Sequence, residues 1–441
     1  MRMKLNKPSQ LVLVSVAGLL AASLVTACQQ FTQTLTVDFV YVASSKGAGA
    51  NSSGNIDVLE INSESGFMRP IPNSPFPSQG RNPVAEAVST DNSSLFVVNQ
   101  DDNTMVQFVI GSDGKLYPYN TVNTPGVFPL AISADSSNLY VLDKFQPLPS
   151  CNTAAPCSGS LAVFPLTPPA SKSAVAAMGS PVVNPATNSN YWPLNLPGAP
   201  SDVVVPTSVA VAGSGDYVYV SAYDSSTTSP TGYVFGFAVA PAGNTAVPPG
   251  STCPANQVGP LAAGLLPPGT LCPLSGSPWA AGKQPSAITA DPSGSYLYAA
   301  DYGSADVLGY SVSSGLLQPL GGSPFPAGNQ PSAIVADPNY PYLFVANSLD
   351  STVSAYSISN GTLTRLGSFA TGLDPVAIGV DPSTNRFVYT ANFLGNNVNN
   401  FVLGTTDGSL LNAQYSPYNA HPNPTAVAAI PHNGTGGGIK K

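Results

Sequence analysis

One short unit recurs along the chain, and it constrains the fold more than any other feature of the sequence. In its clearest form it reads Pro, then Ser or Val, then Ala-Ile and, after two more residues, Asp-Pro, followed by aromatic and aliphatic residues. Four of the six intervals between copies are 44 to 49 residues, and the other two are 77 and 79 residues. A regular interval of this length is typical of repeat architectures. The seven copies begin at Ala85, Pro129, Pro206, Pro285, Pro331, Pro375 and Pro424.

Each repeat contains four short runs with strand composition. In the copy from Pro331 the runs cover residues 333–336, 342–346, 352–357 and 363–368, which are rich in β-branched and aromatic residues and separated by turn residues. No convincing helical periodicity follows the N-terminal segment. Four strands per repeat, seven times over, are typical of a β-propeller. A solenoid is the main alternative, but its end repeats would need polar caps.

The two ends of the repeat region complement each other. The copy from Pro424 supplies only an innermost strand, whereas residues 36–44, 56–61 and 67–71 form a unit that lacks one. Joined, they complete one blade and leave no free sheet edge. We therefore predict an all-β fold over residues 36–432, a seven-bladed β-propeller with four antiparallel strands per blade, closed by pairing of the N- and C-terminal strands.

The two long intervals predict insertions at about residues 145–200 and 240–277. Each insertion is rich in Pro, Ala and Ser and contains two cysteines. Closeness in sequence favours disulfides Cys151–Cys157 and Cys253–Cys272, although the other pairings remain open if the two segments meet in space. Whether the insertions cover the central channel or decorate the rim is left open.

The N-terminus has the features of an export signal. Basic residues precede an uncharged apolar run at residues 11–25, which is short for a membrane span. The run ends in Val25-Thr26-Ala27-Cys28, which resembles a bacterial lipobox. We expect a signal peptide at 1–27, lipidation of Cys28, a tether at 28–35 and a flexible tail at 433–441. Gln29, in place of an Asp, favours the outer over the inner membrane; an ordinary signal peptide is the alternative.

Composition excludes several functional classes. Only 8% of the residues are charged and the net charge is −8, which disfavours nucleic acid as a partner. Two histidines and the absence of a CxxC pair argue against a metal site. We expect no cofactor and a monomeric protein, whose partners would be the membrane through Cys28 and a small polar ligand or an envelope protein.

Several blade segments resemble known propellers. Residues 39–43 read Phe-Val-Tyr-Val-Ala, and residues 387–392 read Phe-Val-Tyr-Thr-Ala-Asn after an Asp-Pro-Ser turn. Over about residues 36–432 the chain resembles YVTN-type surface propellers and lactonase-type seven-bladed propellers, which include 6-phosphogluconolactonases and carboxymuconate-cyclising enzymes. The resemblance implies a ligand site at one mouth of the channel. Its motifs mark blade cores and turns, so they indicate fold more strongly than chemistry.

Polar side chains are expected to gather at that mouth. In a propeller, the loops that precede the innermost strands and those that join second to third strands meet on one face. Their side chains in this chain suit hydrogen bonding to a neutral sugar or lactone, and they also suit plain solvated loops. The candidate binding residues are Asn99, Asp143, Lys144, Asp224, Asp301, Tyr302, Asn347, Asp374 and Asn392.

Glu86 is the most unusual residue of the innermost strands. Alignment on the acid that follows the strand places Glu86 with Ser332, whereas alignment on Pro83 places it in a column of Ile and Val. A desolvated carboxylate there would have a raised pKa and could act as general acid or base, with Arg81 and His421 holding a developing oxyanion.

Two functions remain open at this point. The favoured interpretation is an envelope-anchored binding or scaffolding module with a polar channel mouth. The alternative is a hydrolase that opens a sugar-acid lactone, as 6-phosphogluconolactonases do, by carboxylate-assisted attack of water. The resemblance implies His, Arg and Glu at the mouth of such enzymes. This chain has only five arginines, which favours binding.

Overall fold

The computed structural model describes residues 36–45, 52–62, 65–167, 175–199, 201–213, 215–241, 247–253, 266–382 and 387–431. The predicted signal peptide, Cys28, the tether and the tail at 433–441 lie outside these residues and stay predictions. The one helical element of the described part is the 3-10 turn η1 (Gln100–Asp102). None of the helices in that part has the length and apolar character needed to span a membrane.

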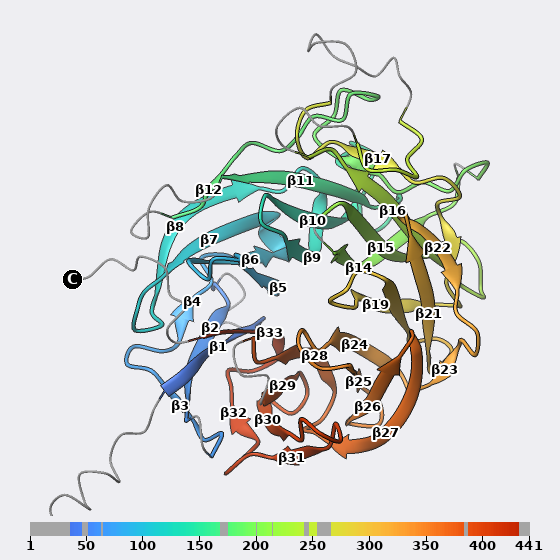
Figure 1. Ribbon diagram of the computed structural model, residues 1–441. Coiled ribbons are helices and arrows are strands. Elements are labelled where there is room, and N and C mark those ends of the chain that lie inside the picture. The colour runs from blue at the N-terminus through green and yellow to red at the C-terminus, as the bar shows by residue number, and fades with distance from the viewer. Residues whose placement is uncertain are drawn as a thin grey trace, which may run out of the picture.

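The described strands form seven antiparallel sheets arranged in a ring around a central opening (Figure 1). We number these blades from the one that holds the N-terminal strands and give their strands from the centre outward. Blade 1 comprises β33 (Pro424–Pro431), β1 (Thr36–Ser44), β2 (Asn55–Asn62) and β3 (Met68–Pro70). Blade 2 comprises β5 (Pro83–Val88), β6 (Ser94–Asn99), β7 (Thr104–Ile110) and β8 (Leu116–Asn123). Blade 3 comprises β9 (Val127–Ala134), β10 (Asn138–Phe145), β11 (Ser160–Thr167) and β12 (Ala177–Met178).

The other four blades follow the same order. Blade 4 comprises β14 (Val204–Ala212), β15 (Tyr217–Asp224), β16 (Thr231–Val239) and β17 (Leu271–Pro273). Blade 5 comprises β19 (Pro285–Ala290), β20 (Tyr296–Asp301), β21 (Asp306–Ser313) and β22 (Leu316–Pro319). Blade 6 comprises β24 (Pro331–Ala336), β25 (Tyr342–Asn347), β26 (Thr352–Ser359) and β27 (Thr362–Ala370). Blade 7 comprises β28 (Pro375–Val380), β29 (Phe387–Asn392), β30 (Asn397–Leu403) and β31 (Leu410–Asn412). Five two-residue strands pair with third strands: β4 (Phe76–Pro77), β13 (Trp192–Pro193), β18 (Trp279–Ala280), β23 (Phe325–Pro326) and β32 (Tyr418–Asn419).

The ring is closed through blade 1. Strand β1 pairs antiparallel with β33, with Phe39 opposite Ile430 and Ala43 opposite Ala426. The Thr425 hydroxyl donates a hydrogen bond of 2.8 Å to the carbonyl of Pro83, which joins the closing strand to blade 2. The prediction of a seven-bladed propeller closed by its two terminal strands is confirmed.

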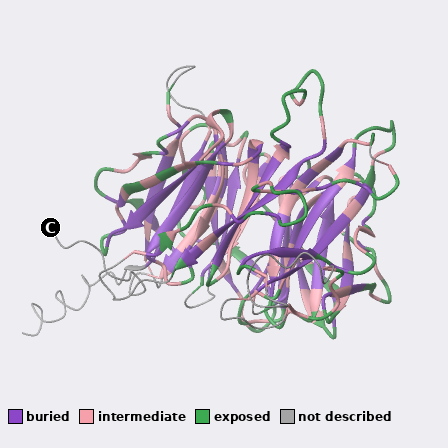
Figure 2. Cartoon of the chain, turned by 90° about the horizontal axis from the view of Figure 1, so that it is seen from above, coloured by how far each residue is buried: buried purple, intermediate pink, exposed green. Residues whose placement is uncertain are grey.

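The core lies between the blades. Seven buried hydrophobic clusters occupy the seven interfaces, one between each pair of neighbours. Strand β6 shows the cause: Leu95 and Val97 pack toward blade 1, whereas Phe96 and Val98 pack toward blade 3. Side chains alternate between the faces of a strand, so apolar second strands fill the gaps on both sides. Buried strands therefore cross the molecule and exposed loops lie at their ends (Figure 2).

Both predicted disulfides are present, Cys151–Cys157 with Cα atoms 5.5 Å apart and Cys253–Cys272 with Cα atoms 5.2 Å apart. The first predicted insertion, residues 145–200, is not continuous, because β11 (Ser160–Thr167) lies within it. The extra residues fall on both sides of that strand. The second, residues 240–277, falls between the third and fourth strands of blade 4 and includes β17.

Candidate functional site

Two loops from each blade build one mouth of the channel: the loop before the innermost strand and the loop between the second and third strands. Backbone hydrogen bonds join these two loops. The carbonyl of the residue before the innermost proline accepts from the loop between the second and third strands. These bonds join the N–H of Gln100 to Asn82, of Ser348 to Gln330 and of Phe393 to Asp374, at 2.9, 2.9 and 2.8 Å. Asn82, Gln330 and Asp374 all have positive φ, which Asn and Asp tolerate better than most residues.

Five predicted binding residues lie fully buried at the ends of second strands, beneath the mouth. Four of the side chains bond the loop that leads to the innermost strand, whereas the fifth, Asn392, donates to Asn397 and Asn399 of the third strand. Asp143 Oδ2 accepts from the N–H of Gly126 at 3.0 Å, and Asp301 Oδ2 accepts from that of Lys283 at 2.6 Å. Burial raises the pKa of Asp143 to about 7. The five buried residues are Asn99, Asp143, Asp301, Asn347 and Asn392.

Two further predicted binding residues are also engaged within the protein. Asp224 is buried and accepts from the backbone N–H of Ser226 at 2.8 Å. The ammonium group of Lys144 lies 5.6 Å from the ring centre of Phe145. These contacts fix both side chains against their own loops.

Glu86 lies within β5, and strand register settles its alignment. Pro83 lies opposite Asn99 and Glu86 opposite Val97, just as Ile334 lies opposite Val345 in blade 6. Alignment on Pro83 is therefore correct, and Glu86 occupies the aliphatic column. Its two carboxylate oxygens are inaccessible and form no hydrogen bond with any described residue, and the exposed part of this half-buried residue belongs to its other atoms.

The surroundings of Glu86 are apolar. Its side chain faces the interface between blades 1 and 2. The pKa of the nearby Tyr41 phenol is raised mainly by burial and, to a smaller extent, by the negative charge of Glu86. Burial raises the pKa of Glu86 itself to about 8, even though the backbone of Ala428 acts to lower it. Most of the Glu86 carboxyl is thus protonated at neutral pH.

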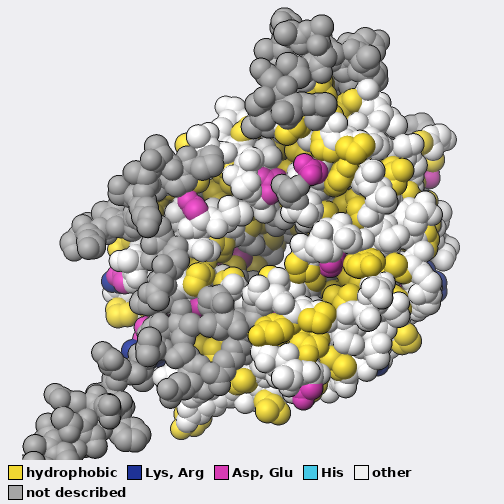
Figure 3. All heavy atoms as spheres, in the orientation of Figure 1, with side chains coloured by type: hydrophobic (Ala, Val, Ile, Leu, Met, Phe, Trp, Pro, Cys, Tyr) yellow, Lys and Arg dark blue, Asp and Glu magenta, His cyan; other side chains and the backbone are white. Residues whose placement is uncertain are grey.

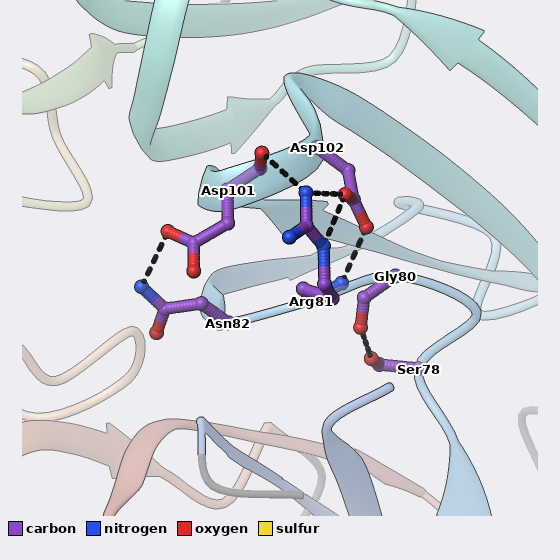
Figure 4. A network of polar contacts seen from close by, with 6 residues as sticks. All are labelled: Ser78, Gly80, Arg81, Asn82, Asp101 and Asp102. Carbon is purple, nitrogen blue, oxygen red and sulfur yellow. Dashed lines mark hydrogen bonds and ion pairs between the residues drawn. The ribbon is translucent and has the colours of Figure 1, made fainter. Parts of the chain in front are cut away.

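Arg81 pairs with blade 2 and not with Glu86 (Figure 4). Its Nε donates to Asp102 Oδ1 at 2.6 Å, and its guanidinium also donates to the carbonyl of Asp101 at 3.1 Å. The bond from Arg81 holds the pKa of Asp102 below its usual value. The pair fastens the loop before β5 to η1.

His421 is engaged in blade 1. Its Nδ1 lies 2.8 Å from Asp57 Oδ1, and its backbone N–H donates to Asp57 Oδ2 at 2.8 Å. No hydrogen bond or ion pair among the described residues joins Glu86, Arg81 and His421 to one another. Arg81 and His421 are thus engaged with acids of their own blades, and the predicted catalytic group of the three residues stays a prediction.

Tyr302 and Asp374 line a shared cavity of about 490 Å³ at the mouth, over blades 5 to 7. Gln330 lines it between them, and no described residue forms a hydrogen bond with the side-chain polar atoms of these three residues. Burial raises the pKa of the Asp374 carboxyl. The cavity thus presents a carboxyl group, a phenol and an amide that are available to a ligand. Its remaining lining residues are Ser332, Ser348, Leu349, Ser351, Leu373, Val376 and Leu394.

The leucines of this cavity were missed by sequence reasoning because mouth loops were searched for polar groups. The signal was present: Leu349 and Leu394 stand where blade 2 has Asp101 and blade 5 has Gly303.

The described residues were also searched for a metal site. In the described part of the chain, no cluster of three or more His, Cys, Asp or Glu side chains is arranged to hold a metal ion.

Comparisons with known proteins agree with this architecture. Residues 316–429 match the family described as "Lactonase, 7-bladed beta-propeller". A search of the curated proteins gave no match. Among solved structures, a Bacteroides fragilis protein provisionally assigned as a 6-phosphogluconolactonase is similar with a TM-score of 0.65 and 17% identity, over 90% of this chain and 99% of that one. The periplasmic gluconolactonase of Pseudomonas aeruginosa is similar with a TM-score of 0.60 and 17% identity, over the same shares. At such identities the likeness shows the fold.

Proposed function

We propose that this lactonase-like seven-bladed β-propeller hydrolyses an uncharged lactone in the cavity lined by Tyr302, Gln330 and Asp374. The observation that carries the proposal is that a carboxylate, a phenol and an amide, none of them hydrogen-bonded to a described residue, line one cavity of about 490 Å³. A volume of this size is usual for small-molecule sites. The matched family and the gluconolactonase neighbour support lactone chemistry over scaffolding.

Asp374 is the general base of the proposed reaction. Its carboxylate takes a proton from water while the water oxygen attacks the lactone carbonyl carbon, and the carbonyl oxygen becomes an oxyanion. The phenol of Tyr302 and the amide of Gln330 donate hydrogen bonds to that oxyanion. Collapse of the intermediate breaks the ring C–O bond, and the proton on Asp374 passes to the leaving oxygen. The product is the open hydroxy acid.

Electrostatics favours Asp374 over Glu86 in this role. The Glu86 carboxylate is shielded from solvent between two blades, so neither water nor substrate reaches it. Asp374 lines the cavity, and partial burial raises its pKa and so its basicity.

The cavity favours an uncharged ring over a phosphorylated one. None of the described residues that line it is Lys, Arg or His. A phosphate group needs positively charged or N–H donors, and the protein as a whole carries a net charge of −8. We therefore propose a neutral lactone rather than a phosphorylated sugar lactone as the substrate.

The test is hydrolysis of D-glucono-1,5-lactone and δ-valerolactone by the purified full-length protein, corrected for the spontaneous reaction. Asp374→Asn is expected to lower kcat/KM by about a hundredfold or more. Asp407→Asn is the matched control, because Asp407 is an acid in an outer turn of blade 7. Equal turnover by Asp374→Asn and wild type would remove Asp374 from the mechanism.

A binding module is the second candidate function. No described side chain orients the Asp374 carboxylate by a hydrogen bond, whereas general bases are commonly held in this way. If the wild-type protein hydrolyses no lactone but binds lactones measurably by calorimetry, the propeller is a binding protein.

We also propose that the chain is an exported lipoprotein, lipidated at Cys28 and held in the outer membrane. The two disulfides support an oxidising compartment outside the cytoplasm. Metabolic labelling with a palmitate analogue and membrane fractionation test this. Cys28→Ala should abolish the label, and label retained by that variant would contradict the proposal.

A further inference from the structure

The channel mouth is chemically divided. Over blade 2 it carries the charged network of Arg81, Asp101 and Asp102, whereas over blades 6 and 7 it carries three leucines. Leu349, Leu373 and Leu394 are 65%, 62% and 61% exposed, and all three line the cavity of Asp374. Hydrophobic side chains gather beside the central opening in the space-filling view (Figure 3).

Backbone hydrogen bonds hold these leucines in place. Leu394 stands between Phe393 and Gly395, whose N–H groups donate to the carbonyls of Asp374 at 2.8 Å and Leu373 at 3.0 Å. Leu394 is thus fixed beside both residues. Leu349 follows Ser348, which is bound through its N–H to Gln330 at 2.9 Å. We call Leu349, Leu373 and Leu394 the apolar rim. The backbone hydrogen bonds that position Gln330 and Asp374 also position this apolar rim.

At the position of Leu373 the other six blades differ: three have a charged or polar residue, and three have an apolar one, Val127, Val204 or Pro422. Leu373 lies two residues before its innermost proline, where blade 2 has Arg81 and blade 5 has Lys283. Single exposed leucines are common on protein surfaces, but three around one cavity form a ligand-sized apolar area. The exposed leucines make the mouth hydrophobic over blades 6 and 7, in contrast to the charged network over blade 2.

We propose that the substrate lactone carries an apolar substituent, such as an alkyl chain, which lies against Leu349, Leu373 and Leu394 while the ring faces Asp374. This inference rests on the proposed function and deepens it. The bond changes are those of lactone hydrolysis, since the substituent takes no part in the chemistry. A small ligand is favoured over a protein partner because the leucines line a cavity of about 490 Å³.

The experiment is a chain-length series of δ-lactones: hexalactone, octalactone and decalactone, with D-glucono-1,5-lactone as the polar reference. Each added methylene is expected to raise kcat/KM by up to about fourfold, less where the chain stays partly hydrated. The series should thus rise at least about tenfold from hexalactone to decalactone. The double variant Leu373→Ser/Leu394→Ser should flatten the rise of kcat/KM with chain length.

Leu411→Ser is the matched control, because Leu411 is 67% exposed on the outer strand β31 and lies outside the cavity. It should keep the full rise. Hydrolysis that is equally fast along the series overturns the inference and leaves the proposed function standing.

A binding series separates the two proposals if turnover is absent. Alkyl δ-lactams, which share the ring shape but resist hydrolysis, are titrated by calorimetry. Affinity that grows with chain length, and is lost in the double variant, supports the apolar rim even if hydrolysis fails. Affinity independent of chain length overturns it.

Discussion

Glu86→Gln is expected to remove a large pH dependence from the stability of the propeller. The wild-type carboxyl has a folded-state pKa of about 8, against an ordinary value of 4.5. The folded protein therefore holds the proton more tightly than the unfolded chain. The resulting stability is fully present below pH 4.5 and is lost as pH rises through about 8.

The magnitude follows from the shift. The folded-state and unfolded-state pKa values of Glu86 differ by roughly 3.5, and each pH unit between them changes the free energy of unfolding by about 1.4 kcal/mol. The whole difference therefore amounts to about 5 kcal/mol of stability that is lost when the pH rises past both values. Any water that reaches the carboxylate on ionisation would reduce this figure. Asp143, with a pKa raised to about 7, and Asp306, with a pKa raised to about 6, add slopes of the same sign. The difference between wild type and Glu86→Gln isolates Glu86.

The assay is urea denaturation of both proteins from pH 5 to pH 9. At pH 5 the two should unfold at similar midpoints, because an amide resembles the protonated acid in shape and lacks charge. At pH 8.5 the variant should be more stable by about 3–5 kcal/mol. Parallel stability curves for the two proteins would refute the assignment of a buried, uncompensated carboxyl at this position.

Three further outcomes test other parts of the structure. Thr425→Val should destabilise the ring by about 1–2 kcal/mol in urea denaturation, because its hydroxyl bonds to the carbonyls of Pro83 and Ala43, whereas exposed Thr362→Val should not. Gly361→Ala should lower stability by more than about 1 kcal/mol, because φ is +81° and a Cβ would lie 2.5 Å from the Tyr296 ring; Gly321→Ala, with open space around it, is the control, and equal loss would contradict the argument. Lactone turnover should fall as pH is lowered, with a midpoint above 3.8, since Asp374 must be ionised and burial raises its pKa; an acid limb that survives in Asp374→Asn would assign it to another group.

The fold was predictable because the repeat reports directly on packing. Alternation in runs such as Leu95–Val98 reflects the two interblade gaps that each second strand fills, and the incomplete first and last copies imply closure. The local disulfides followed from short spacing. The sequence analysis placed β11 (Ser160–Thr167) inside an insertion. The insertions were inferred from the length of the interval between repeats, and that length does not tell on which side of a strand the extra residues lie.

The site was less predictable, since polarity at a strand end does not tell a ligand contact from a structural tie. Asn347 and Asp374 are both polar residues predicted to lie at the mouth, yet Asn347 is buried and accepts a hydrogen bond from the N–H of Gly328, whereas Asp374 lines the cavity. Asn347 ends a second strand, and Asp374 directly precedes an innermost one. The exposed leucines required comparison of equivalent loop positions across blades.

Pairing of β1 with β33 has a consequence for biogenesis. The two strands are separated by nearly the whole propeller, so during synthesis the first blade waits with an unpaired edge until the last residues emerge. Such an edge is a template for aggregation. Removal of β33 (Pro424–Pro431), a strand of only eight residues, would leave this edge of β1 unpaired even though the remaining blades are complete.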